Sequence, residues 1–305
     1  MKNRHRIWMA AALAVGMGWL AGCESLNQVA ELGASIAVAT GDLSEEQAGS
    51  ITRTTRAVTK TFEDITPEQE YYIGRSVAAT VLMGYTPLNH DDLNWYVNHV
   101  GQSLSQFSTR PETFGGYRFL VLDSDEINAF AAPGGLVLVT RGLLKCCETE
   151  DELAAVLAHE IGHVEKLHGL RAIKTGRLSG ALTTLALESA KNLGGRELAE
   201  LTKAFDESIS DVTTTLMNSG YSRRLEYEAD AAAVAILRQA GYTPGALVAM
   251  LENMQRNWNP ARLDFAKTHP PPADRIAQLR RAGVTAAKDT APARQARFAA
   301  AIQSL

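Results

Sequence analysis

Cysteine is scarce in this chain, with only 3 among 305 residues. Cys146 and Cys147 are adjacent, and neighbouring cysteines rarely pair because the small ring that would form departs from normal disulfide geometry. There is no second pair of cysteines to complete a four-cysteine zinc site. We therefore interpret these two residues as structural or incidental thiols, in preference to a redox pair.

An excess of positive charge and a long apolar run are missing as well. Lys and Arg number 30 against 34 Asp and Glu, which gives a formal net charge of −4. This balance does not resemble the basic surface that binds nucleic acid, so no nucleic-acid partner is expected. The apolar run at residues 7–22 is shorter than the roughly 20 residues that a spanning helix needs. Residues 178–187 are shorter still and contain Ser and Thr, so several membrane spans are not expected.

The start of the chain has the pattern of a secretory signal. Basic residues at positions 2, 4 and 6 precede the short apolar run, which is typical of such signals. The run ends in Leu-Ala-Gly-Cys at residues 20–23 and resembles the bacterial lipobox, whose cysteine is lipidated and becomes the new N-terminus. The alternative is an ordinary signal peptide with an unrelated cysteine. Lipidation of Cys23 implies an anchored protein that does not span the membrane.

Two further consequences follow from cleavage before Cys23. Residues 1–22 carry three positive charges and no acidic ones, so the formal net charge would change from −4 to −7. Glu24 follows the cysteine where Asp would direct retention at the inner membrane. By analogy with lipoprotein sorting in Gram-negative cells, this favours the outer membrane, with the rest of the chain in the periplasm.

The remaining patterns divide the chain into three parts: a signal peptide at 1–22, a lipidated tether with an N-terminal helical segment at 23–66, and one domain at 67–305. Helices are predicted near 67–83, 91–107, 222–240, 243–258 and 292–303, with two or three more within 171–220. A strand is predicted at 117–123, followed by a hairpin. About 240 residues can bury a sizeable core. The predicted fold class is α+β, mainly helical, with a small sheet beside one central helix.

Histidine is also rare, with 7 residues, yet two of them occur in His159-Glu160-Ile161-Gly162-His163. Residues four apart on a helix share one face, so both imidazoles can reach one Zn²⁺ at about 2.0–2.1 Å. The flanks predict that helix, with Thr149 as N-cap, Glu152 completing a capping box and Gly169 just beyond the end. Glu160 can then act as a base on a water at an open metal position, which indicates a zinc peptidase. The alternative is a surface helix with two unrelated histidines.

A catalytic zinc site needs a third protein ligand. Glu226 and Asp230 lie one turn apart on a second predicted helix. We expect Glu226 to be that ligand, with one Zn²⁺ per chain. We expect Asp230 to accept a hydrogen bond from the other nitrogen of a ligand histidine and so fix its orientation. The alternative is a solvated acidic helix start.

Three nearby positions are not expected to supply a metal ligand. A histidine six residues beyond His163 completes the site in one class of zinc peptidases, but Gly169 stands there. His168 points elsewhere on the predicted helix and is interpreted as a structural histidine. Glu228 points to a different face from Glu226.

These two helices resemble those of the CAAX prenyl protease/HtpX-type metallopeptidase family, which are gluzincins with a zincin-like domain. Residues 128–140 resemble the family's edge hairpin ahead of the zinc helix, and residues 268–276 resemble its late His-Pro…Arg segment. The resemblance covers roughly residues 65–282, with the motifs in the family's order. It implies a zinc metallopeptidase domain, with His159, His163 and Glu226 as ligands and Glu160 as the base.

The resemblance also implies roles for residues outside the two helices. The hairpin offers an edge strand to which a peptide can add itself, and Asn128 and Ala129 would bind the substrate main chain; the alternative is an ordinary edge strand. His269 would be a fourth ligand that closes the site at rest, or would stabilise the oxyanion, or has no role. Arg275 would pair with an acidic group near the site or cap local structure.

Together, the resemblance and the signal predict a membrane-anchored periplasmic zinc metalloendopeptidase that degrades misfolded or misassembled envelope proteins. The alternative from another class is a zinc-stabilised chaperone or assembly-factor lipoprotein with little or no proteolysis. Prenyl-protein processing is disfavoured by the missing membrane spans and by the lipobox.

Overall fold

The computed structural model describes residues 44–45, 65–173, 213–214, 220–257, 269, 271–287, 290–303 and 305. Nearly all of them belong to one compact unit formed by Thr66–Ala172 and Ile209–Leu305. The expected signal peptide, Cys23 and most of the tether lie outside the described residues. So do most of the helices expected within 171–220.

A three-stranded sheet supports the zinc-motif helix. Its strands are β1 (Arg118–Leu122), β2 (Ala129–Ala132) and β3 (Leu136–Thr140), in the order β1-β3-β2. β3 is parallel to β1 and antiparallel to β2. The turn between β2 and β3 contains Gly134 at a φ of 76°, a left-handed conformation that glycine adopts without steric cost. The predicted strand and hairpin are therefore confirmed, and β2 lies at one edge of this sheet.

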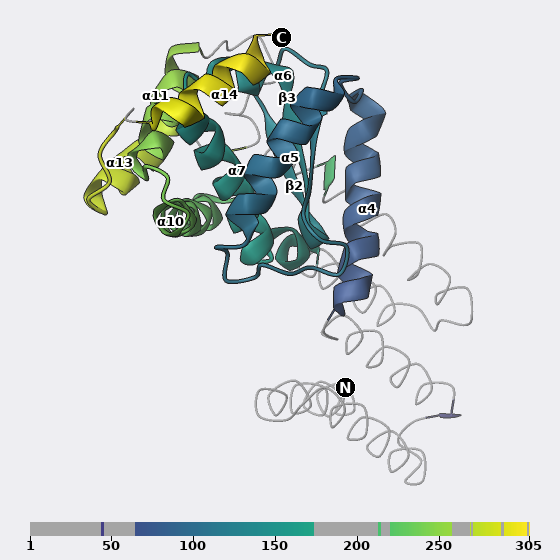
Figure 1. Cartoon of the computed structure of the whole chain (residues 1–305). Helices are drawn as coiled ribbons and strands as arrows, with labels where there is room; N and C mark the ends of the chain where they lie inside the picture. The colour runs from purple at the N-terminus through teal and green to yellow at the C-terminus, as the bar shows by residue number, and fades with distance from the viewer. Residues whose placement is uncertain are drawn as a thin grey trace. The chain divides into compact units, whose positions relative to one another are not determined.

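The two faces of the sheet are covered by different helices (Figure 1). Val137 and Val139 belong to the main core cluster, which includes residues of α5 (Asp91–Ser105) and α7 (Glu150–Glu165). Leu138 points to the opposite face, because successive side chains of a strand alternate, and it is buried on the side contacted by α4 (Pro67–Gly84). The predicted capping box at the start of α4 is present in full.

The central helix α7 is buried on all sides, from Glu150 to Val164. Besides the sheet, it packs against α10 (Arg223–Gln239) and α11 (Gly245–Asn257). Gly162 lets α10 come close, because a Cβ atom at that position would lie 2.9 Å from the carbonyl oxygen of Ala229. The glycine of the zinc motif therefore has a packing role, since it brings the helix that carries Glu226 against the helix that carries the two histidines.

The start of α7 differs in part from the prediction. Thr149 is the N-cap, and its hydroxyl accepts a hydrogen bond from the backbone N–H of Glu152 at 3.2 Å. The Glu152 carboxylate does not complete the capping box. It accepts hydrogen bonds from the N–H of Glu148 at 2.5 Å and from the side chain of Asn253 at 3.0 Å, which ties α7 to α11.

The end of α7 was predicted wrongly. The helix ends at Glu165, and Leu167 adopts a φ of 56°. Gly169 lies within the next helical residues, 168–173. A Cβ atom there would lie 3.1 Å from Cγ of Pro133, so this glycine is explained by close packing against the hairpin.

Three further helices complete the described unit: α6 (Arg141–Cys146), α13 (Pro272–Arg281) and α14 (Pro292–Ile302). α14 confirms the helix predicted near residues 292–303, whereas α6 and α13 were not predicted. Three prolines at residues 270–272 disfavour a helix interior, but Pro272 occupies the first turn of α13, where its fixed φ and missing N–H are tolerated. The predicted fold class, mainly helical α+β with a small sheet, is confirmed.

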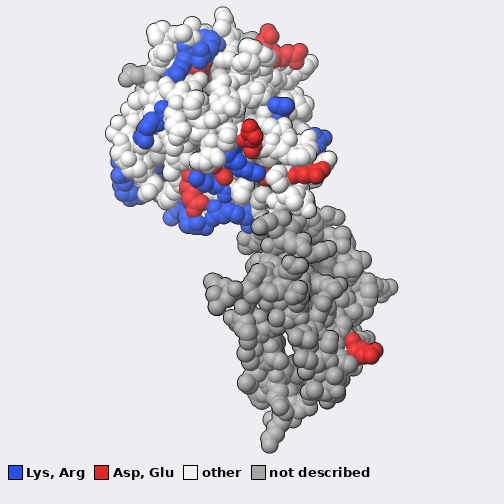
Figure 2. All heavy atoms as spheres, turned by 60° about the horizontal axis from the view of Figure 1, so that its bottom comes forward, with Lys and Arg blue, Asp and Glu red and all other residues white. Residues whose placement is uncertain are grey.

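The surface and the helices of the described part add two observations. None of its helices has both the length and the apolarity needed to cross a membrane. On the face shown in Figure 2, Lys and Arg are interspersed with Asp and Glu among uncharged residues.

Candidate metal centre

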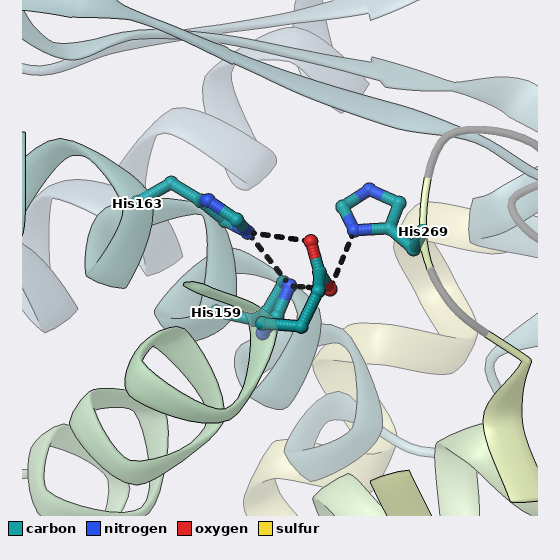
Figure 3. A group of neighbouring side chains, drawn as sticks. His159, His163 and His269 are labelled. Atoms are coloured by element: carbon teal, nitrogen blue, oxygen red, sulfur yellow. Dashed lines mark hydrogen bonds and ion pairs between the residues drawn. The ribbon is translucent and has the colours of Figure 1, made fainter. Parts of the chain in front are cut away.

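Four side chains from three segments converge beneath the sheet (Figure 3). His159 and His163 come from α7, Glu226 from the first turn of α10, and His269 from the segment before α13. One donor atom of each lies within 4.8 Å of the others, and all four residues are buried. The structure thus brings together the three expected ligands and His269.

The distances suit a tetrahedral zinc ion. The Nε2 atoms of His159 and His163 are 3.1 Å apart, and they lie 3.4 and 3.5 Å from the two carboxylate oxygens of Glu226. Ligands at about 2.0–2.1 Å from one tetrahedral ion are separated by about 3.3–3.4 Å. Oε1 of Glu226 is buried without a hydrogen-bond partner, a costly state for a carboxylate unless it is paired or binds a metal. Two imidazoles and one carboxylate form a donor set that Zn²⁺ uses, so these residues fit the ion.

The far side of His159 is held by charged groups. Its Nδ1 atom lies 2.9 Å from Oδ1 of Asp230, and Arg275 donates to both oxygens of that carboxylate, at 3.0 and 2.5 Å. Burial raises the pKa of Asp230, but the charge of Arg275 and the bond from His159 lower it below its usual value. Asp230 is therefore an ionised acceptor for His159, and Arg275 lies beside an acidic group of the site.

The ionisation of His159 and Glu226 follows from the same neighbours. Burial and Arg275 lower the pKa of His159, but bonds to Asp230 and Glu226 outweigh them and raise it to about 9. Burial raises the pKa of Glu226, but the charge of His269 and the bond from His159 bring it well below its usual value. Glu226 is therefore a carboxylate, the form that binds a metal.

Glu160 lies next to this group and is 1% exposed. Its Oε1 atom is buried without a hydrogen-bond partner. Burial raises its pKa, against the opposing influence of His269 and His159. A carboxylate with a raised pKa and an oxygen not otherwise engaged is suited to accept and release a proton.

Sequence reasoning missed the neighbours of His163. His168 was expected to point away, but its Nδ1 atom lies 3.0 Å from Nδ1 of His163. Glu228 was set aside on another face, but its Oε2 atom lies 3.2 Å from Nε2 of His168. Burial lowers the pKa of His163 well below its usual value and also lowers that of His168, so both rings are neutral. Neither Gly nor Pro marks the break after α7, so helical phase was misleading at this point.

The ring of Tyr221 covers His163 from another direction. The two rings are stacked, with centroids 4.3 Å apart and planes at 21°. No sequence pattern pointed to this residue. Its contact limits the directions in which the His163 ring can turn.

The expected substrate-binding residues lie at the start of the edge strand, and both are buried. The carbonyl of Asn128 accepts a hydrogen bond from the N–H of Thr140, and its side-chain oxygen accepts one from the N–H of Ala129 at 2.9 Å. Because antiparallel pairs alternate, the backbone groups of Ala129 and Ala131 point away from β3. The N–H of Ala129 is thus already bonded within the chain, which leaves Ala131 as the donor that an added strand would use.

A small cavity separates this strand from the metal ligands. Ala131 and Ala132 line it on the strand side, His163 and Val164 on the side of α7, and Leu170 beyond. Of the four residues of the metal group, His163 alone lines this cavity.

Comparison with known proteins gives a consistent family match. The family described as Peptidase family M48 matches residues 92–282. The chain is 30% identical over 219 residues to the beta-barrel assembly-enhancing protease of Escherichia coli K12, covering 69% of this chain and 42% of that protein. It is 34% identical over 158 residues to the mitochondrial metalloendopeptidase OMA1 of Schizosaccharomyces pombe, covering 50% of this chain and 42% of that protein. It is 30% identical over 162 residues to the metalloprotease LoiP of Escherichia coli K12, covering 53% of this chain and 61% of that protein. The chain thus spans 42% of the length of the beta-barrel assembly-enhancing protease.

Proposed function

This chain belongs to peptidase family M48, a family of zinc metalloendopeptidases, and from that premise we propose that it cleaves unfolded or misassembled proteins of a Gram-negative cell envelope. One observation carries the proposal: His159, His163 and Glu226 converge in one buried group. Glu160, which belongs to the same motif as the histidines, is buried beside them with an unpartnered oxygen. A structural zinc site has no need of such a carboxylate.

The residues divide the chemistry between them. His159, His163 and Glu226 would hold Zn²⁺, which would supply Lewis acidity for the activation of water and of a carbonyl. Glu160 takes the proton of the attacking water on its carboxylate and delivers it to the leaving amine. The edge of β2 holds the peptide extended, so that its scissile bond is positioned beside Glu160. Asp230 and Arg275 hold the imidazole of His159 in one orientation.

His269 is proposed to regulate the access of water and substrate to the metal site. Its position within the donor group fits a fourth ligand that closes the site at rest and moves away to admit water and substrate. The same observation favours the second candidate, because a site closed by four protein ligands is typical of structural zinc. In that case the protein is a zinc-stabilised chaperone or assembly factor of the envelope with little or no proteolysis.

The location and substrates are supported by the sequence and by the relatives. A basic segment, a short apolar run and the Leu-Ala-Gly-Cys pattern support export and lipidation at Cys23, with Glu24 favouring the outer membrane. The name of one relative, beta-barrel assembly-enhancing protease, links that protein to the assembly of β-barrels. Envelope proteins with exposed chain segments are therefore the proposed substrates of this chain.

Comparative proteomics of the envelope tests the proposed function. Cells that carry Glu160→Gln in place of the wild type should accumulate particular envelope proteins, because the variant keeps the metal ligands but lacks the base. Identical envelopes in the two strains, under conditions that damage envelope proteins, would contradict a proteolytic role. Cys23→Ser tests the anchor in the same cells: it should move the protein from the membrane fraction to the soluble periplasm, and unchanged fractionation would rule out the lipid.

A further inference from the structure

We propose that His168 and Glu228 position the zinc ligand His163, by fixing which of its two ring nitrogens carries a hydrogen and which faces the metal. The inference rests on the proposed function, because it requires zinc at His163. It assigns a role to two residues that sequence reasoning set aside. Both act through His163 and are positioning residues.

The hydrogen bonds that run from His163 through His168 to Glu228 have only one consistent direction. Nε2 of His163 faces the other metal donors, so it carries no hydrogen when it binds a metal, and the neutral ring bears its hydrogen on Nδ1. That N–H points at Nδ1 of His168, 3.0 Å away, which must then be the acceptor. The single hydrogen of His168 therefore lies on Nε2, from which it is donated to the Glu228 carboxylate at 3.2 Å.

Glu228 is itself held in place. Arg171 donates to its Oε2 atom at 2.9 Å, and Arg224 to its Oε1 atom at 2.6 Å. These bonds fix the carboxylate as an acceptor for His168. The two ligand histidines thus reach a carboxylate in different ways: His159 contacts buried Asp230 directly, whereas His163 reaches the partly exposed Glu228 through one intervening imidazole.

The backbone before His168 supports a positional role. Leu167 adopts a φ of 56°, a conformation that costs a non-glycine residue about 1–2 kcal/mol. The side chain of Leu167 is 37% exposed, so deep burial of that side chain does not account for the strained turn. The turn ends α7, and His168, 0% exposed, lies directly after it against His163. Strain of this kind is found where the surrounding structure requires a particular placement.

Zinc affinity, measured by competition with a chromogenic chelator, tests the inference without reference to activity. Five forms of the full chain are compared: wild type, His168→Leu, His168→Gln, Glu228→Gln and His99→Leu. His168→Leu removes the acceptor and should weaken zinc binding about 10–100-fold. His168→Gln keeps an acceptor oxygen and should restore most of the affinity. Glu228→Gln should weaken binding severalfold, and His99→Leu should change nothing, because that ring stacks on Trp95 at the surface of α5.

The outcomes separate positioning from folding. Thermal unfolding of the metal-free forms reports stability alone, so a loss of zinc affinity in His168→Leu without a matching loss of metal-free stability supports positioning. Zinc binding by His168→Leu within twofold of the wild type would overturn the inference, as would a His168→Gln variant that binds as weakly as His168→Leu. A wild type that binds zinc but cleaves nothing would count against the proposed peptidase function only. A wild type that binds no zinc would contradict both the proposed function and the positioning role of His168 and Glu228.

Discussion

The Nδ1 atom of His269 lies 2.8 Å from Oε2 of Glu226, and both side chains are buried. This contact places the His269 ring against the carboxylate ligand, which is the position expected of the proposed closing side chain. If His269 closes the site at rest, as proposed, access to the metal group requires it to move.

His269→Ala should raise the basal rate of peptide cleavage severalfold, because the closing side chain is gone while Glu160 and the other ligands remain. Zinc-edge absorption spectroscopy should show one imidazole nitrogen ligand replaced by an oxygen donor such as water. An unchanged set of ligands would remove the proposed closing role. A variant with the expected ligand change but no activity, alongside an inactive wild type, would favour the chaperone alternative.

Asp230→Asn should weaken zinc binding about 10–100-fold, because His159 loses the carboxylate that orients it. The variant also takes from the guanidinium of Arg275, 1% exposed, the carboxylate that accepts its hydrogen bonds, and Glu226, 3.6 Å away, is a more distant charged neighbour. This should lower the free energy of unfolding by about 3 kcal/mol, measured by urea unfolding of the metal-free chain. Asp274→Asn is the matched control, because its ion pair with Arg223 is solvent-exposed and is worth about 0–1 kcal/mol. Equal effects of the two variants would contradict the role given to Asp230.

Glu150 bonds the first turn of α7 to α5, to α14 and to the segment between α10 and α11. It accepts hydrogen bonds from Tyr96 at 2.9 Å, Tyr242 at 3.0 Å and Arg297 at 2.5 Å, and it is 0% exposed. Glu150→Ala should therefore lower the free energy of unfolding by about 2–3 kcal/mol through the lost charged hydrogen bonds, seen as a shift in the urea midpoint.

The control for Glu150 lies two residues earlier. Glu148 pairs with Arg256 at 3.2 Å, and both side chains are about half exposed. Glu148→Ala should cost less than about 1 kcal/mol. A Glu150→Ala variant as stable as Glu148→Ala would show that α7 does not depend on this anchor.

The two free cysteines should react with alkylating reagents only at high pH or after unfolding. Burial raises the pKa of Cys146 to about 11 and lifts that of Cys147 well above its usual value. The thiolate is the reactive form, so at pH 8 about one Cys146 in a thousand is reactive. In a Cys23→Ser chain, labelling by iodoacetamide should be very slow at pH 8, should accelerate as the pH rises toward 11, and should be rapid in urea. Rapid labelling of the folded chain at pH 8 would contradict this account.

The parts of the fold that local patterns encode were predictable. The α7 and α10 helices, the β2–β3 hairpin and the N-cap at Thr149 follow from helical spacing, turn residues and capping chemistry. The convergence of Glu226 with His159 came from the chemistry of a third ligand, since no sequence spacing fixes it. Gly162 shows how the structure achieves it, because the missing side chain lets α10 approach α7.

The parts that depend on strain or on distant packing were not predictable. Leu167 carries no signal for a left-handed turn, so His168 was assigned the wrong direction. Gly169 looked like a helix end because its packing partner, Pro133, is far away in sequence. The helix that carries Arg275 was hidden by three prolines, of which only the last lies inside it.

The central claim is that Glu160 acts as the base of a zinc peptidase, and one comparison tests it most directly. Purified wild type and Glu160→Gln are loaded with zinc, their zinc content is measured, and the cleavage of an unfolded test protein is followed over time. The account predicts one zinc per chain in both forms, with cleavage by the wild type and a rate at least about 100-fold lower in the variant. A zinc-loaded Glu160→Gln variant that cleaves at the wild-type rate would contradict the account.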